Sequence, residues 1–239
     1  SYDEQNMALR NASPSFDHWL GTDKMGRDIF VRILFGARIS LAVGCLAAVI
    51  NLIVGTIYGG IAGYVGGKVD MIMMRVVDII YSVPSMLYIV LIMLIFGASV
   101  VSIMLGISIT CWIDMARIVR QQVKSLKEQE FTMAAFVLGA SSSRILLKHL
   151  LINTMGQIIV TVTLMVPQAI FTEAWLSFLG VGISAPMASW GTLAQDAREL
   201  IMTYPMQTVY PMIAICITIF SFNFVGEGLE KALDPKRKR

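Results

Sequence analysis

Few residues in this chain have the types and spacing that catalysis requires. The 239 residues include two histidines, His18 and His149, which lie far apart in the sequence and form no recognisable pair with a serine nucleophile. The chain also lacks the GxxxxGK[ST] phosphate-binding loop and the HExxH zinc motif. We therefore expect no catalytic residue, no cofactor-binding residue and no metal ligand on this chain.

Charged residues at helical spacing are the other candidates for chemistry. Arg75 and Asp78 are three residues apart, as are Asp114 and Arg117, so each pair can meet on one helical face. Together with Glu173, such groups could relay protons if they lay in mid-membrane. All of them flank long uncharged segments, where water is close. This position argues against a proton-translocating subunit or a membrane-embedded enzyme.

The elements that must position these residues are long apolar segments. The chain is 56% hydrophobic and 15% charged, whereas a soluble domain has about 25% charged residues. Uncharged stretches of 29, 35, 23 and 27 residues follow Arg38, Asp78, His149 and Glu199. About 20 apolar residues cross about 30 Å of hydrocarbon as a helix. The sequence therefore predicts an all-α, polytopic membrane protein.

Five membrane-spanning helices account for these stretches. Pro84 is expected to kink the second span, a turn at 97–99 should separate the second span from the third, and Pro167 lies inside the fourth. Glycines in the first span indicate close packing against a neighbouring helix; they are Gly55, Gly59, Gly60 and Gly63. The expected spans cover about residues 33–63, 71–96, 100–124, 153–176 and 207–230.

Basic residues give the orientation and the domain boundaries. The 63–75 turn, the 115–149 loop and the C-terminus hold 13 of the 19 Lys and Arg residues, so the positive-inside rule places them in the cytosol. Five spans then leave residue 1 outside, and we expect a preceding first helix that is missing from this sequence. The predicted parts are an extracytoplasmic segment with an interfacial helix (1–30), a transmembrane domain (31–232) with a cytosolic loop (125–150) and an outer loop (177–206), and a basic cytosolic tail (233–239).

The cytosolic loop is longer than a connection between two helices needs, since about two to eight residues usually suffice. Residues 131–138 are compatible with one or two helical turns, and Gly139 stands where a left-handed helix stop needs no Cβ. Ser141 can then cap a second short helix at 142–150. Two short helices at an angle would form a compact knob that fits a cleft in a partner, and an ordinary surface loop is the alternative.

The loop contains the pattern Ala134-Ala135, three residues, Gly139, five residues, Ile145, three residues and His149, which resembles that of a known family. It is similar to the EAA loop of permease subunits of binding-protein-dependent ABC importers, in which the loop forms a coupling helix that sits in a groove of the ATPase subunit. The family's glutamate is Met133 here, and the usual proline after the histidine is Ile152, so a role for charge at 133 does not carry over. The resemblance implies that the residues coupling this chain to an ATPase subunit are Ala134, Ala135, Gly139, Ala140, Ser141, Ile145 and His149.

Two further stretches narrow the resemblance. Trp19–Asp28 followed by Arg32–Leu41 looks like the segment before the second transmembrane helix in C-type permeases of dipeptide, oligopeptide and nickel importers. Leu176–Gly182 with Ser189–Gly191 is similar to the outer loop of the same subfamily. In that family the first of six helices precedes this segment, which agrees with the expected missing helix.

The extracytoplasmic parts have two possible roles. Thr22 or Asp23 can cap a helix that begins near Met25. The outer loop is expected either to form an outer gate and contact for a binding protein, or to place Trp190 and Tyr204 in an aromatic belt at the bilayer edge. The residues assigned to the gate or contact are Gly180, Gly182, Trp190 and Gly191.

The resemblance implies the partners and the cargo. This chain would form half of a translocation pathway in a bacterial plasma (inner) membrane, with a second homologous permease, two ATP-binding subunits that hold ATP and Mg²⁺, an external solute-binding protein and membrane lipid, and without nucleic acid. Oligopeptides or dipeptides are the expected cargo. Nickel or another small solute in the same architecture is one alternative, and a membrane channel or proton-translocating subunit is an alternative of another class.

Overall fold

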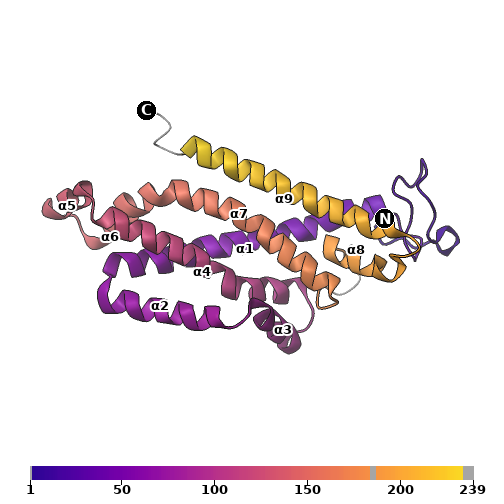
Figure 1. The fold of residues 1–239 in the computed structure, drawn as a ribbon, viewed down its shortest axis with the longest axis horizontal. Coiled ribbons are helices and arrows are strands. Elements are labelled where there is room, and N and C mark those ends of the chain that lie inside the picture. The colour runs from indigo at the N-terminus through magenta and orange to yellow at the C-terminus, as the bar shows by residue number, and fades with distance from the viewer. Residues whose placement is uncertain (1, 184–186, 234–239) are drawn as a thin grey trace. The chain divides into compact units, whose positions relative to one another are not determined.

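The computed structural model describes residues 2–183 and 187–233, which form an all-α fold (Figure 1). The predicted basic tail falls mostly on 234–239, outside the described residues. The elements are η1 (Met7–Leu9), α1 (Ile29–Val65), α2 (Gly67–Ser82), α3 (Ser85–Phe96), α4 (Val100–Lys127), α5 (Glu130–Val137), α6 (Ser142–Arg144), the π-helical turn η2 (Ile145–Leu150), α7 (Leu151–Phe178), α8 (Trp190–Ala197), η3 (Arg198–Leu200) and α9 (Pro205–Leu233).

The predicted polytopic architecture is confirmed. Among the described residues, four continuous helices are long and apolar enough to cross a membrane, namely Ile29–Val65, Val100–Lys127, Ser142–Phe178 and Pro205–Leu233. The pair α2 and α3 supplies a fifth candidate span, broken at Pro84 and bent by 77°. Proline has no backbone N–H to donate, so the expected kink at Pro84 is here a complete break between two helices.

The long helices contribute to two compact units. One unit comprises Ser1–Leu46, Ile89–Gly106 and Val166–Phe222, and the other comprises Ala47–Tyr88, Ile107–Met165 and Asn223–Arg239. The first unit contains the outer loop and the N-terminal segment. The second unit contains the 125–150 loop, together with α2 and parts of α1, α4, α7 and α9.

In the second unit, glycines bring α1 into close contact with α4. A Cβ added at Gly59 would lie less than 3.0 Å from the Ala116 backbone. A Cβ added at Gly63 would likewise lie less than 3.0 Å from the backbone carbonyl oxygen of Arg120. Gly60 has only ordinary contacts, with Leu151 and Leu146. Small residues that recur every four positions let two backbones approach closely, so the predicted packing of the first span is confirmed, with α4 as its neighbour.

The start of α1 differs from the sequence prediction. The helix begins at Ile29 and not near Met25, and the Asp28 carboxylate accepts a hydrogen bond from the Val31 amide at 2.9 Å. Residues 22–28 form a turn closed by a β-bridge between Thr22 and Asp28. The helix that the sequence placed near Met25 therefore begins at Ile29 as the first part of α1, because Asp23 is occupied in organising the turn that precedes it; its interfacial position stays a prediction.

Candidate functional site

The loop between the third and fourth spans forms a helix, a tight turn and the start of a second helix. At the end of α5, the Gly139 amide donates to the Phe136 carbonyl at 3.0 Å, and the Ala140 amide donates to the Ala135 carbonyl at 3.1 Å. Gly139 has φ +80°, a left-handed conformation that glycine adopts without steric cost. The predicted helix stop at Gly139 is therefore confirmed.

The second half of this loop differs from the prediction of a separate short helix. Ser141 precedes α6 as expected, but its hydroxyl makes no capping hydrogen bond to the helix. The Ile145 amide donates to the Ser141 carbonyl at 2.9 Å, and the chain continues through η2 directly into α7. Ser142–Phe178 is consequently one continuous helix, because no residue in it ends the hydrogen-bonded ladder.

One side of this segment is fixed to the second unit. The Thr132 hydroxyl donates to the Leu126 carbonyl at 2.8 Å, which ties α5 to the end of α4. Ile145 is buried in an apolar cluster with Val119, Val123 and Leu150, and the half-buried Ala135 and Ala140 pack against that cluster. Of the residues predicted for coupling, Ala135, Ala140 and Ile145 thus support the segment from within.

The other side of the segment exposes apolar residues. Phe136, Val137 and Leu138 are 72%, 84% and 86% exposed, although they are apolar and lie outside the spanning helices. Ala134 and Ser141 are also exposed, while His149 is half-buried and its carbonyl accepts from the Asn153 amide group. The sequence analysis missed Phe136, Val137 and Leu138. Their signal was a run of three apolar residues directly before a helix-ending glycine in a loop.

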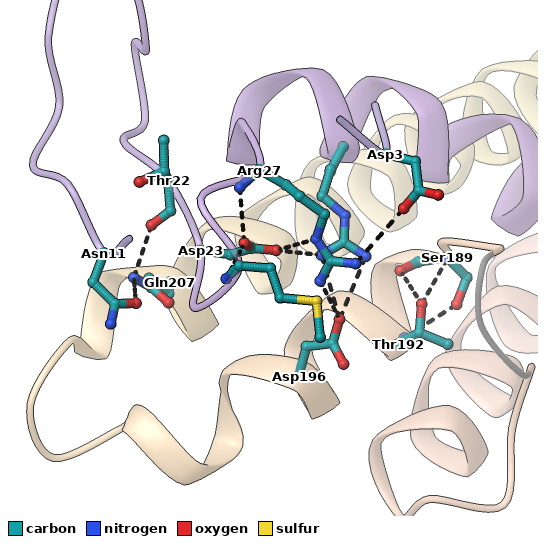
Figure 2. Close-up of polar contacts among 11 residues, drawn as sticks. Asp3, Asn11, Thr22, Asp23, Arg27, Ser189, Thr192, Asp196 and Gln207 are labelled. Atoms are coloured by element: carbon teal, nitrogen blue, oxygen red, sulfur yellow. Dashed lines mark hydrogen bonds and ion pairs between the residues drawn. The ribbon is translucent and has the colours of Figure 1, made fainter. Parts of the chain in front are cut away.

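A buried charge network joins the N-terminal segment to the outer loop in the first unit. The Arg27 Nε donates to the Asp23 Oδ2 at 2.7 Å, and Arg27 Nη2 and Arg32 Nη1 each reach Asp196 Oδ2 at 3.3 Å. Figure 2 shows Arg27 between Asp23 and Asp196, with Asp3 on its far side. Because Asp196 belongs to α8, these charges fix α8 to the turn that precedes α1.

Hydrogen bonds determine the charge state of Asp23 within this network. Burial opposes ionisation of the carboxyl group, but it accepts bonds from the Arg27 and Met25 amides and from the Arg27 side chain. These bonds outweigh the burial and hold the pKa of Asp23 below its ordinary value of 3.8. Asp23 is therefore a carboxylate that offsets the charge of Arg27 and of Arg32.

A second polar cluster in the first unit surrounds Glu173 on α7. Its carboxylate is fully buried and accepts hydrogen bonds from the hydroxyls of Ser40 at 3.2 Å, Ser177 at 2.8 Å and Ser189 at 2.7 Å. Ser189 also caps α8 through its bond from the Thr192 amide. Glu173 consequently links α1, α7 and α8 within the unit.

The residues predicted for an outer gate lie against this cluster. Trp190 is buried, and its Nε1 donates to the Ile33 carbonyl at 3.0 Å, so the prediction that it joins an aromatic belt is wrong. Cβ atoms at Gly182 and Gly191 would collide with Ser177 and Ala174 of α7, while Gly180 ends the turn after α7 with φ +88°. These residues pack the outer loop onto α7, and their role as a gate or as a contact for a binding protein stays a prediction.

The charged pairs expected from helical spacing are arranged differently. Arg117 on α4 contacts Asp78 on α2 at 3.1 Å, where the sequence paired Asp78 with Arg75 and Arg117 with Asp114. Arg120 makes two hydrogen bonds to Asp70, one of them between Nη2 and Oδ2 at 2.6 Å. The pairs form between helices because α2 and α4 lie side by side, which spacing within one helix cannot reveal.

The apolar spans, one of them broken at Pro84, and the structured loop between two other spans agree with a comparison to known families. Residues 55–239 match the family described as binding-protein-dependent transport system inner membrane component. The chain belongs to this family. It is a permease subunit, a non-catalytic membrane component of a binding-protein-dependent transport system, located in the inner membrane with several spans.

Individual relatives match nearly the whole chain. It is 52% identical to the oligopeptide transport system permease protein OppC of Bacillus subtilis (strain 168), over 100% of this chain and 79% of that protein. It is 48% identical to the dipeptide transport system permease protein DppC of the same organism, over 98% and 74% of the two chains. The OppC protein of Escherichia coli (strain K12) is 43% identical, over 99% and 79%. The predicted resemblance to this permease subfamily is therefore confirmed.

Solved structures share the fold. The inward-facing MetNI methionine ABC transporter has a chain with a TM-score of 0.69 and 16% identity, and the match covers 86% of this chain and 98% of that one. A chain of an amino acid ABC transporter has a TM-score of 0.65 and 14% identity, with 85% and 94% covered. At such low identity these structures support the fold of an importer membrane domain alone.

Proposed function

We propose that this chain forms one half of the translocation pathway of an ATP-driven peptide importer. The observation that carries the proposal is its identity to oligopeptide and dipeptide permeases over nearly its whole length. The names of these relatives favour oligopeptides or dipeptides as cargo over nickel or another small solute. In the complex, a second homologous permease supplies the other half of the pathway. An external binding protein delivers the peptide, and two partner subunits bind ATP and Mg²⁺.

The contact with an ATPase subunit is assigned to α5 and the turn that follows it. Phe136, Val137 and Leu138 present apolar surface outside the spans, where lipid does not cover it. Exposed apolar patches of this kind mark protein interaction sites, and a helix in a groove is a recurring way to bury them. Thr132 and Ile145 hold the base of the segment, so a partner that moves α5 also moves α4 and α7. This arrangement favours a coupling element over an ordinary surface loop.

Uptake of labelled peptides tests the proposed function. The purified complex, in proteoliposomes with internal ATP and its binding protein, should accumulate di-, tri- or pentapeptides and not nickel chelates. Accumulation that requires ATP also separates an importer from a passive channel. Downhill flux that is indifferent to ATP would contradict the proposal.

Gly139 provides a sharp test of coupling. Beyond its own chain neighbours, no atom lies within 4 Å of an added Cβ at this position, so a substitution acts through the backbone conformation. Valine at φ +80° costs about 1–2 kcal/mol or more, whereas asparagine tolerates left-handed conformations. Gly139→Val should uncouple ATP hydrolysis from peptide uptake, and Gly139→Asn should retain coupling. Normal uptake by Gly139→Val would count against the coupling role.

A further inference from the structure

Helices α2 and α4 lie side by side in the second unit (Figure 1), and charged side chains from both line a groove between them. On α2, Asp70, Met74 and Asp78 are spaced four residues apart and lie on one face; α4 presents basic and polar side chains to them. The Arg117 guanidinium also lies 4.4 Å from the centroid of the Tyr81 ring. The groove holds a cavity of about 530 Å³ that is lined by Met74, Asp78, Arg117, Arg120, Gln121 and Lys124.

Counted from Val100, the Arg117 end of the groove falls within the length that α4 needs to cross the hydrocarbon, whereas Arg120 and Lys124 fall just beyond it. The uncharged part of α4 is its first 14 residues, Val100–Ile113, which is about 21 Å of helix. Crossing about 30 Å of hydrocarbon requires about six more residues, which carries the span past Asp114 and Arg117. Ionised side chains at that depth face protein or water, because lipid solvates charge poorly.

The opposite face of α2 shows which surface lipid can cover. Ile72, Val76 and Ile79 follow one another at helical spacing and are 62%, 43% and 62% exposed. Asp78, directly before Ile79, is 55% exposed. The same helix therefore presents an apolar stripe and a charged stripe. Lipid can cover the first stripe, and the second requires water or a polar ligand.

The charges in the groove are of mixed sign. Arg117 faces Asp78, while Arg120 and Lys124 share Asp70, with Lys124 Nζ at 3.6 Å from Asp70 Oδ2. Two carboxylates therefore oppose three cations, which leaves one positive charge in excess. The carboxylates of Asp70 and Asp78 would repel an anionic lipid headgroup, which a cluster of cations alone would favour. A peptide with ionised termini carries one ammonium and one carboxylate, and mixed charges can bind both weakly and release them.

We infer that the groove between α2 and α4 is part of the aqueous pathway and contacts the charged termini of the transported peptide. Asp78 accepts hydrogen bonds from the N-terminal ammonium of the peptide. Arg117 and Lys124 donate hydrogen bonds to the C-terminal carboxylate of the peptide. The cavity is within the range of volumes that accommodate small ligands, about 300–1,000 Å³. The assignment to peptides rests on the proposed function, whereas the aqueous character of the groove does not.

Labelling of introduced cysteines tests the aqueous character. The complex would carry serine at Cys45, Cys111 and Cys216 and would be reconstituted in phosphatidylcholine vesicles with a charged, membrane-impermeant methanethiosulfonate on both sides. Asp78→Cys and Ile79→Cys are adjacent on one helix and differ in the stripe they occupy. Gln121→Cys is a second groove position at which no ion pair is broken.

Both groove cysteines should react at least about tenfold faster than Ile79→Cys, because the thiolate is the reactive species and an apolar environment raises the pKa of a thiol. Groove cysteines that react as slowly as Ile79→Cys would overturn the inference. The inference also fails if their labelling is fast in phosphatidylcholine but blocked by added phosphatidylglycerol, since an anionic lipid would then occupy the groove.

Uptake of blocked peptides tests the contact with the termini. Arg117→Gln should reduce uptake of a tripeptide with free termini about two- to fivefold, the effect of one partly exposed ion pair, and should leave uptake of its C-terminal amide unchanged. Arg75→Gln, which removes a charge from α2 outside the groove, is the matched control and should leave both peptides unaffected. Equal losses for the free and the amidated peptide would overturn the contact. If the wild-type complex accumulates no peptide, the proposed function has failed, and the labelling result still reports on the groove.

Discussion

Gly59 and Gly60 offer a paired test of the packing between α1 and α4. They are neighbours on α1, but an added Cβ at Gly59 would lie less than 3.0 Å from the Ala116 carbonyl, while at Gly60 the nearest atom is a Leu151 methyl at 3.5 Å. Alanine at either position gains up to about 1 kcal/mol of helix propensity. The difference in the free energy of unfolding between Gly59→Ala and Gly60→Ala therefore isolates the cost of overpacking, because the gain in helix propensity is common to both.

The size of this difference follows from what must move. The atoms facing Gly59 belong to the backbone of α4, so no side-chain rotation can relieve the contact and the two helices must separate. Overpacking of this kind costs about 1–3 kcal/mol. For a chain of this length, 1 kcal/mol corresponds to about 2–4 °C in Tm. Gly59→Ala should therefore melt about 2–12 °C below Gly60→Ala.

The difference in Tm is measured by heating the purified complex in detergent. Unfolding is detected as the loss of monodisperse complex in size-exclusion chromatography. Wild type provides the reference, and Gly60→Ala should match or exceed its Tm. Equal Tm values for the two variants would refute the close approach of α1 to α4 at Gly59.

Two further predictions concern polar groups in the first unit. Because the pKa of Asp23 is lower in the folded protein, its stabilisation is complete above the ordinary value of 3.8 and is lost as the pH falls through the folded value. Wild type should therefore lose more Tm between about pH 5 and pH 3 than Asp23→Asn does, and parallel profiles would contradict the assignment. Glu173→Ala leaves three buried serine hydroxyls without their acceptor and should cost about 3 kcal/mol or more. Glu173→Gln keeps one acceptor oxygen and should cost less, so equal Tm values for these two variants would show that the serine bonds are not stabilising.

The parts of the fold that depend on local backbone chemistry could be predicted from the sequence. Pro84 lacks an amide hydrogen and breaks the second span, and Gly139 ends α5 in a conformation that other residues adopt at a cost. The uncharged stretches identified the spans for an equally direct reason, since their length matches the thickness of the hydrocarbon.

The parts that depend on tertiary contacts could not be predicted in the same way. Asp23 and Asp28 are equally good helix caps by type, and the choice of Asp28 follows from the bonds of Asp23 to Arg27 and Arg32. Asp78 has a suitable partner on its own helix, yet it pairs with Arg117 on another. The burial of Trp190 likewise depends on α1, which provides the carbonyl for its indole.

The helix that follows the α5 turn has an irregular start with a mechanical consequence. Its π-helical turn, Ile145–Leu150, joins residues five apart by hydrogen bonds. Ile145 and Leu150 are five apart, and both are buried in the apolar cluster with Val119 and Val123 of α4. The start of this helix is therefore anchored to α4 at two points within the second unit. A change of this turn to regular α-helical geometry, at 3.6 residues per turn, would rotate one of the two anchors out of the cluster.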